Sequence, residues 1–131
     1  MDPRRLRRVA GLVAGLAAGL VGGPVWAADP AVRVLVQSSP LAGFRYHEAG
    51  DLWDLLRVGD ALELRREPDN PHDPHAVAVW WRGRKLGYVP RRENGALAWG
   101  MDRGERIGAR VSRLAAHPNP ARRIELEVYA E

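Results

Sequence analysis

The stretch LRREPDNPHDPHAVAVWW, Leu64–Trp81, joins two runs of alternating apolar residues through a segment with three prolines. Proline fixes φ and lacks a backbone N–H donor, so this segment cannot pair inside a sheet. Asn70 and Asp73 can instead bond neighbouring backbone N–H groups. The stretch therefore predicts an ordered loop over Glu67–Pro74 that joins two antiparallel strands.

The chain beyond residue 27 also alternates apolar and polar residues with the period of two that is typical of strands. The candidate strands are Val32–Ser38, Asp60–Glu67, His75–Trp81, Arg84–Pro90, Arg106–Leu114 and Arg122–Ala130. The short turn RGR, Arg82–Arg84, predicts that the third and fourth strands form a hairpin.

A single short helix is expected between the fourth and fifth strands. Ala96, Leu97, Gly100 and Met101 recur there at helical spacing, and Gly104 can end the helix. Short strands with one inserted helix fit a small, partly open β-barrel better than a layered α/β sheet. The predicted fold class is therefore mostly β, with about six strands.

Residues 1–27 are typical of a secretory signal peptide. A basic start is followed by an apolar run from Val9 to Val21 and by small residues up to Ala27, which is the order found in export signals. The pattern predicts cleavage after Ala27, a single domain over residues 28–131, and a periplasmic or secreted protein. A retained membrane anchor is the alternative, but the apolar run is shorter than the roughly 20 residues that span a bilayer. We expect no stable membrane span after cleavage.

The basic character of the chain belongs largely to this leader. The formal net charge is +4, from 20 basic and 16 acidic side chains. Residues 1–27 carry four of the basic side chains and one of the acidic ones, so 16 and 15 remain and the net charge falls to +1. Overall charge therefore gives no support for tight nucleic-acid binding, and any such case depends on local placement. The absence of cysteine excludes a disulfide framework and leaves one small core.

No catalytic machinery is apparent in the sequence. Cysteine and threonine are absent, the serines lie in strand-like contexts, and no nucleophile elbow or glycine-rich phosphate loop occurs. Carboxylate pairs such as Glu63 and Glu67 are typical of solvated strand ends. The sequence predicts a binding protein rather than an enzyme.

The HDPH stretch brings His72 and His75 close to Asp69 and Asp73, which suggests a metal site. Three-residue spacing brings two ligands together on a helix, and the neighbouring prolines prevent a helix here. Two histidines without a third ligand are more typical of a solvated loop. We therefore expect no metal and no other cofactor.

Adjacent Trp80 and Trp81 must point to opposite faces of their strand. One ring is therefore expected in the core. The other is expected outside, under the stems of Arg82 and Arg84.

The stretch LELRREPDNPHDPHAVAVWWRGRKLGYVPRRENGALAWGMDRG, Leu62–Gly104, resembles the HIRAN domain, in which an L-x-R-E-P-x-N-P-x-D-x-x-A-V-x-V pattern leads to G-Y-V/L-P and a helix. The upstream GFRYHEAG of Gly43–Gly50 matches a further pattern of that family. The resemblance covers roughly Val32 to Tyr129. It implies an OB-like β-barrel that occurs alone or at the front of DNA-remodelling helicases and grips the 3′ end of single-stranded DNA.

The resemblance also implies a binding pocket. Arg45 and Tyr46 stand where the family has an arginine and an aromatic ring lining it, and Asp73 stands where a carboxylate caps the terminal hydroxyl. Tyr88 and Arg91 occupy positions that contact a base or a phosphate. A strand end requires an acceptor for its sugar hydroxyl, cations for its last phosphate and flat rings for its base. The alternative is that Asp73 only caps the loop and that both tyrosines are ordinary barrel residues with their hydroxyls outward.

His47 and His72 stand where the DNA-end-binding members commonly have tyrosine. A base still stacks on imidazole, but less strongly than the about 1–3 kcal/mol per base found for larger rings. Because both histidines titrate, strand binding is expected to tighten as pH falls through about 6.5.

Two classes of function remain open. The first is a module that binds the end of a nucleic-acid single strand. The second is an extracytoplasmic module that keeps the barrel but binds another envelope protein or an envelope polymer, since a role at replication forks is hardly compatible with export.

Overall fold

The structure is a computed structural model of the 131-residue chain, and it describes residues 33–131. The predicted signal peptide and its cleavage site after Ala27 lie outside the described residues and stay predictions. Within residues 33–131, no helix has the length and apolar character needed to cross a membrane.

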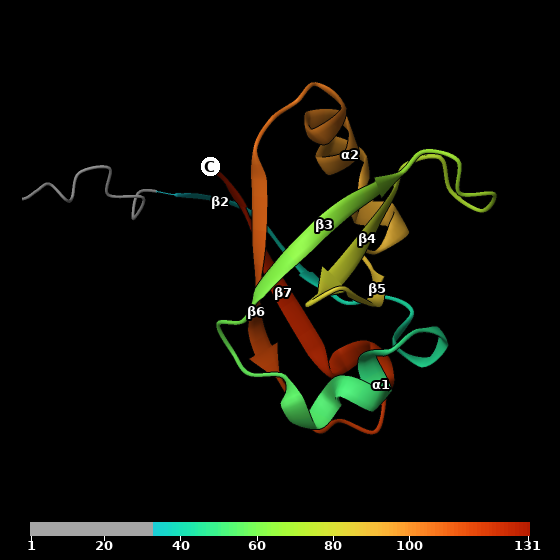
Figure 1. Cartoon of the computed structure of the whole chain (residues 1–131), viewed down its shortest axis with the longest axis vertical. Helices are drawn as coiled ribbons and strands as arrows, with labels where there is room; N and C mark the ends of the chain where they lie inside the picture. The colour runs from blue at the N-terminus through green and yellow to red at the C-terminus, as the bar shows by residue number, and fades with distance from the viewer. Residues whose placement is uncertain (1–32) are drawn as a thin grey trace, which may run out of the picture. The chain divides into compact units, whose positions relative to one another are not determined.

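Six antiparallel strands form one sheet, and they are the strands that the alternating pattern predicts (Figure 1). They are β2 (Val34–Pro40), β3 (Ala61–Glu67), β4 (Ala76–Trp81), β5 (Arg84–Tyr88), β6 (Ile107–Leu114) and β7 (Ile124–Ala130). Their spatial order is β2-β7-β6-β3-β4-β5. The predicted hairpin is confirmed, because β4 and β5 pair across a tight turn between Trp81 and Arg84.

The sheet approaches a barrel without closing into one. In the part of the chain that the structure describes, the edge strands β2 and β5 are not neighbours in the sheet, and an isolated bridge joins Ala42, just after β2, to Tyr88 of β5. Ala42 N donates to Tyr88 O at 2.8 Å, and Tyr88 N donates to Ala42 O at 2.9 Å. Gly87 permits this approach, because a Cβ at that position would collide with the Ala42 carbonyl oxygen. The predicted mostly β, partly open architecture is confirmed, and a closed barrel is not formed.

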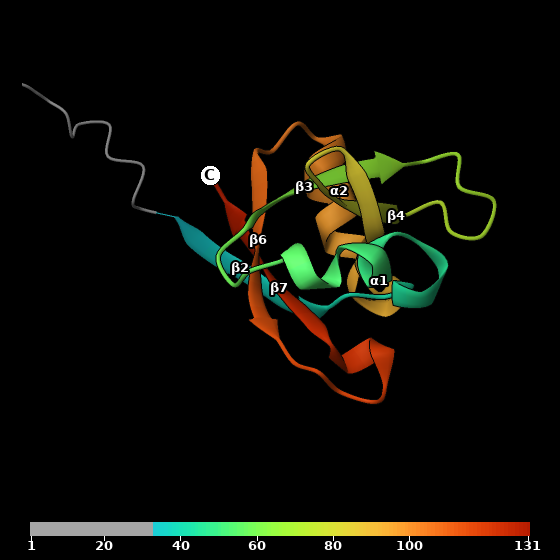
Figure 2. The ribbon, with the colours of Figure 1, turned by 60° about the horizontal axis from the view of Figure 1, so that its bottom comes forward.

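The hydrophobic core packs against one face of β3 but against both faces of β4. Along β3, Leu62 and Leu64 are buried while their neighbours are exposed or half-buried, as alternation requires. In β4, Ala76–Val79 are all buried. The reason is that α2 (Gly95–Asp102) lies beside β4, as both views show (Figures 1 and 2).

Helix α2 is the helix that the sequence predicts, and Gly104, with φ of 86°, follows its end. The structure has further short turns that the apolar pattern does not predict. They are α1 (Ala49–Leu52) and the 3₁₀ turns η4 (Phe44–Tyr46), η5 (Trp53–Leu55), η6 (Arg91–Glu93) and η7 (Pro120–Arg122). Turns of three or four residues are too short to show a helical period. Two of them, η4 and η6, carry predicted site residues.

Candidate ligand-binding site

A cavity of about 340 Å³ lies where three segments meet. These are the connection after β2, the loop between β3 and β4, and the end of β5 with η6. The residues that line it are Ala42, His47, Asn70, His72, Asp73, Ala76, Tyr88, Val89 and Arg91. The Ala42–Tyr88 bridge holds the first segment against the third. The cavity, called the end cavity below, thus brings together five of the seven predicted site residues.

The loop between β3 and β4 is ordered by its own side chains, as predicted. The Asn70 Oδ1 atom accepts hydrogen bonds from the backbone N–H groups of His72 at 2.8 Å and Asp73 at 3.2 Å. The Asp73 Oδ1 atom accepts one from His75 N at 2.9 Å. These turns replace the sheet pairing that the three prolines forbid. They place His72 and Asp73 side by side in the cavity wall.

Arg66 of β3 ties the end of this loop to α2. Its guanidinium donates to the carbonyl oxygens of Ala76 at 2.8 Å and Pro74 at 3.0 Å. It also pairs with both carboxylate oxygens of Asp102, at 2.9 and 3.2 Å. The Arg66 side chain is only 13% exposed, whereas that of Asp102 is 55% exposed, and all four bonds are charge-assisted. The loop is therefore fixed at its far end as well as internally.

Asp73 is held from two sides as an ionised acceptor. Its Oδ2 atom accepts a hydrogen bond at 2.8 Å from the Nδ2 of Asn94, a residue that is 3% exposed. Burial alone would raise the pKa of Asp73, but the bonds from His75 N and Asn94 and the nearby charge of Arg91 outweigh it. The pKa of Asp73 therefore lies below its ordinary value. An ionised carboxylate only accepts hydrogen bonds, so Asp73 presents acceptors to the cavity.

Arg91 is an exposed cation on η6. That turn is pinned to β2 through Glu93: Ser39 Oγ donates to Glu93 Oε1 at 2.9 Å, and Gln37 Nε2 donates to the Glu93 carbonyl oxygen at 2.8 Å. Within the described part of the chain, Arg91 forms no salt bridge. A rigid turn therefore presents an uncommitted positive charge beside Asp73.

The rings of Tyr88 and His47 meet edge to face, with centroids 5.3 Å apart and planes at 67°. The Tyr88 hydroxyl donates to Glu67 Oε1 at 2.8 Å and accepts from Lys85 Nζ at 3.0 Å. Lys85 and Glu67 are themselves paired at 2.7 Å. The hydroxyl is thus engaged, contrary to the alternative of an outward-pointing hydroxyl. The ring of Tyr88 is fixed as a wall.

The surroundings of His47 favour its neutral form. Burial lowers its pKa below 6.5, the positive charge of Lys85 lowers it further, and Glu67 opposes both effects only in part. The expectation that His47 gains charge as pH falls through about 6.5 is therefore corrected to a lower pH.

Arg45 and Tyr46 do not line the end cavity. Both lie in η4, which directs them into a separate hollow that they share with Gly43, Phe44, Asn119, Pro120 and Ala121. That Arg45 and Tyr46 converge with Asp73, Tyr88 and Arg91 on one concave face therefore stays a prediction, since the two groups line separate hollows. The two hollows are neighbours, because a Cβ on Gly43 would lie 3.4 Å from His47 and 3.9 Å from Tyr88. Tyr46 is 82% exposed.

Three residues that support the site are not recognisable from the sequence. Asn94 follows η6 without a motif of its own, and its role depends on meeting Asp73 across the fold. Glu67 and Lys85 lie on different strands, and Glu67 has the pattern of a solvated strand end. Their pairing beneath Tyr88 is a product of how β3, β4 and β5 are arranged. Alternation in the sequence gives the strands, whereas these contacts depend on their register.

The HDPH segment does not gather metal ligands in the described residues. No group of three histidine, aspartate, glutamate or cysteine side chains that could hold a metal ion occurs in residues 33–131. Both oxygens of Asp73 already accept bonds from protein N–H groups.

Comparison with known proteins identifies the family. The HIRAN domain model matches residues 34–131. A solved structure of a protein from Lactobacillus plantarum is 32% identical, with a TM-score of 0.67 over 76% of this chain and 95% of that chain. The human HLTF HIRAN domain is 22% identical and shares the fold, with a TM-score of 0.55 over 76% of this chain and 80% of that chain. No curated protein gives a significant match. Because the family model spans most of the sequence and includes the whole end cavity, the chain belongs to the HIRAN domain family.

Proposed function

We propose that this protein is a non-catalytic module that binds the 3′ end of single-stranded DNA in the end cavity. One observation carries the proposal: an ionised carboxylate and an uncommitted guanidinium, Asp73 and Arg91, lie in one cavity beside two fixed rings. A strand end offers the complementary groups, namely a hydroxyl, a phosphate and a base.

Asp73 is the proposed acceptor for the terminal sugar hydroxyl. Each of its oxygens accepts one hydrogen bond from the protein. A carboxylate offers about four lone-pair sites, so acceptor capacity remains for the ligand. An interior nucleotide has no free 3′ hydroxyl, and this contact would therefore distinguish the end of a strand from its middle.

Arg91 is the proposed partner of the last phosphate. Its charge lies close enough to Asp73 to lower the pKa of that carboxyl, so a hydroxyl and its neighbouring phosphate have partners within one site. Guanidinium groups suit phosphate because they donate two parallel hydrogen bonds.

Tyr88 and His47 are the proposed surfaces for the terminal base. The cavity volume of about 340 Å³ falls in the range of about 300–1,000 Å³ typical of small-ligand sites. We assign the next base to Tyr46 and its phosphate to Arg45, because the hollow that these residues line adjoins the end cavity.

We also propose that the protein acts outside the cytoplasm, on the strength of the signal-peptide pattern in residues 1–27. Recognition through a hydroxyl, a phosphate and a base needs no helicase domain. An exported module could therefore bind free strand ends by itself.

Fluorescence anisotropy with eight-nucleotide strands, carrying either a free 3′ hydroxyl or a 3′ phosphate, tests the proposal. Asp73→Asn should remove the preference for the free hydroxyl, because it weakens the acceptor while keeping the shape of the side chain. Asp69→Ala is the matched control, since it removes an acid from the same loop outside the cavity.

Arg91→Ala should weaken both strands alike and reduce the salt dependence by about 0.7 in slope, the value for one phosphate contact on a single strand. Arg92→Ala, in the same turn but outside the cavity, should do neither. Absence of any strand binding by the wild-type chain at low salt near pH 6 would reject the proposal and favour an envelope-interaction module.

A further inference from the structure

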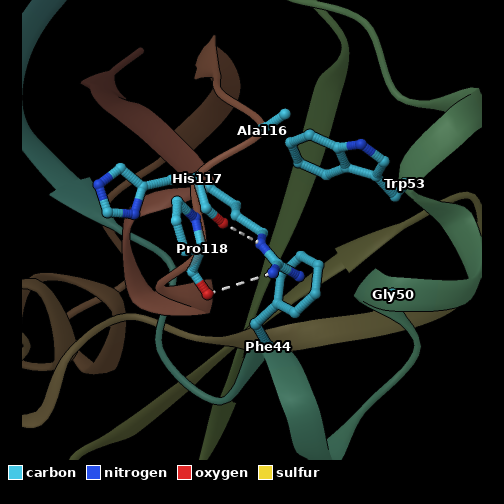
Figure 3. A pocket seen from close by; sticks show the side chains of 7 residues that line it. Phe44, Gly50, Trp53, Ala116, His117 and Pro118 are labelled. Atoms are coloured by element: carbon cyan, nitrogen blue, oxygen red, sulfur yellow. Dashed lines mark hydrogen bonds between the residues drawn. The ribbon is translucent and has the colours of Figure 1, made fainter.

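A second cavity, of about 400 Å³, lies between η4, α1, η5 and the connection from β6 to β7. Figure 3 shows the rings of Phe44 and Trp53 on one side and the His117–Pro118 segment on the other. Gly50 and Arg123 also line it. Nothing in the proposed end recognition uses this cavity, and we call it the aromatic cavity.

The two rings form a fixed apolar wall. Phe44 and Trp53 meet edge to face, with centroids 6.1 Å apart and planes at 69°. Phe44 is 8% exposed and belongs to the core, and Trp53 packs against that core. Because the core holds both rings, the wall exists before any ligand arrives, which lowers the ordering cost of binding.

Arg123 adds a half-buried positive charge to this wall. Its Nε donates to the carbonyl oxygen of His117 at 2.6 Å and its Nη2 to that of Pro118 at 3.4 Å, the dashed lines of Figure 3. The guanidinium lies 5.1 Å from the centre of the Phe44 ring. Among residues 33–131 it has no carboxylate partner. Two of the five N–H groups of an arginine are used, so donors and charge remain for an anion.

The aromatic cavity continues the line of hollows that begins at the end cavity. Phe44 lines both the aromatic cavity and the hollow of Arg45 and Tyr46. Gly43, in that same hollow, adjoins His47 and Tyr88 of the end cavity. The consecutive residues 44–47 therefore direct side chains into three neighbouring hollows, and each hollow has both an aromatic ring and an arginine.

We infer that the aromatic cavity holds a further nucleotide of the same single strand, upstream of its 3′ end. The ring wall would receive the base and Arg123 a phosphate. This inference rests on the proposed function, because it uses the same strand. An apolar wall with an uncompensated cation suits a flat ring that carries an anion, and the adjoining hollows give the strand a path to it.

Gly50→Leu provides a test that leaves Phe44, Trp53 and Arg123 in place. A Cβ on Gly50 would lie 3.7 Å from Phe44 Cε1, an ordinary contact, and Gly50 lines the cavity, so we expect a leucine side chain there to occupy part of it. Gly50→Ala is the matched control, because it adds one methyl group at the same position. Arg123→Gln is a second variant that removes the charge without filling the cavity, and thermal unfolding of each variant checks its fold.

Binding is measured by anisotropy for thymidine strands of two and eight nucleotides with free 3′ hydroxyls. Gly50→Leu and Arg123→Gln should each weaken the eight-nucleotide strand about tenfold, as expected for the loss of one stacked base or its phosphate. Both should leave the two-nucleotide strand unchanged, and Gly50→Ala should match the wild type.

Equal affinities of the wild type and Gly50→Leu for the eight-nucleotide strand would overturn the inference while leaving the end cavity intact. A wild-type chain that binds neither strand would reject the proposed function, and this inference with it. If benzoate binds at Trp53 but eight-nucleotide strands do not shift its indole NMR signal, the cavity serves a free aromatic anion and the strand path is wrong.

Discussion

Replacing Asn94 with alanine removes the hydrogen bond that fixes the Asp73 carboxylate. The Asn94 side chain is almost fully buried, and its Nδ2 lies 2.8 Å from Asp73 Oδ2. A hydrogen bond to a charged group contributes about 1.5–3 kcal/mol to the free energy of unfolding. A buried polar group that loses its hydrogen-bond partner costs a similar amount. We therefore expect the free energy of unfolding to fall by about 2 kcal/mol at pH 7.

The pH dependence separates this effect from simple loss of packing. The bond from Asn94 helps to keep the pKa of Asp73 below its ordinary value, so its contribution exists while Asp73 is ionised and is lost as pH falls through the folded-state pKa. The difference between wild type and Asn94→Ala should accordingly shrink below about pH 4. Lost packing alone would persist at low pH.

Asn94→Asp is a sharper companion variant. It places a second carboxylate at the position of the donor, so like charges face each other and stability at pH 7 should fall below that of Asn94→Ala. Lowering the pH should restore part of that loss, because the pair can then share a proton. Urea unfolding followed by tryptophan fluorescence, with an unchanged m-value, measures all three chains.

NMR titration of the Asp73 carboxyl gives an independent readout. In Asn94→Ala its pKa should rise toward the ordinary value, and the preference for a free 3′ hydroxyl should weaken because the acceptor is less fixed. An Asn94→Ala chain that unfolds within about 0.5 kcal/mol of wild type, the range of ordinary surface changes, would refute this account of how Asp73 is positioned.

Three other outcomes are expected. Titration of the His47 ring by NMR should give a midpoint below 6.5 that rises in Lys85→Met, since burial and the Lys85 charge both lower its pKa; a midpoint at or above 6.5 in the wild type would contradict this. Arg66→Met should lower the free energy of unfolding by about 2 kcal/mol, because two carbonyl oxygens lose charged donors. Amide hydrogen exchange should become faster only in the β3–β4 loop, and an equal increase across the whole domain would contradict this. Mass spectrometry of protein from its native host should find a chain that begins at Ala28, and recovery of the intact Met1 form would disprove cleavage.

The strands were predictable because alternation is a local property. All six predicted strands are present, and their bounds differ by no more than two residues from those expected. The proline loop was predictable for the same reason, because Asn70 and Asp73 bond backbone groups only two or three residues away. Hydrogen bonds between residues so close in the chain can be predicted from the local sequence.

The arginine contacts of Trp80 and Trp81 could not be predicted from the local sequence. Trp81 is buried at 4% exposure, as one member of the pair had to be. Trp80 does not lie under Arg82 and Arg84 as expected: the Arg65 guanidinium covers it, 4.0 Å from its ring centre, and Arg82 lies over Trp81 instead. In the β3–β4 register Trp80 faces Glu63, which puts Arg65 diagonally across from it. Cross-strand register decides this contact, and alternation alone does not give register.

The candidate site shows the same division. Asp73, Tyr88 and Arg91 share a cavity. Tyr88 and Arg91 lie on either side of a two-residue segment, and Asp73 lies on the β3–β4 loop, which the sequence predicts to be ordered. Arg45 and Tyr46 line the neighbouring hollow because both belong to the 3₁₀ turn η4, which ends just before His47. A turn of three residues leaves no periodic trace in the sequence, so its effect on direction could not be anticipated.

The bridge between Ala42 and Tyr88 has a consequence for how this binding site can evolve. The two walls that it joins are held by main-chain atoms, and the approach depends on the absence of a side chain at Gly87. Of the lining side chains, Asn70 and Asp73 order the third wall, the β3–β4 loop, whereas the rings of His47 and His72 are not needed to hold the first two walls together. Rings such as His47 and His72 can be exchanged for larger or differently charged ones without the walls separating. A library that varies His47 and His72 while keeping Asn70, Asp73 and Gly87 should therefore sample new ligand preferences in a cavity whose walls stay in place.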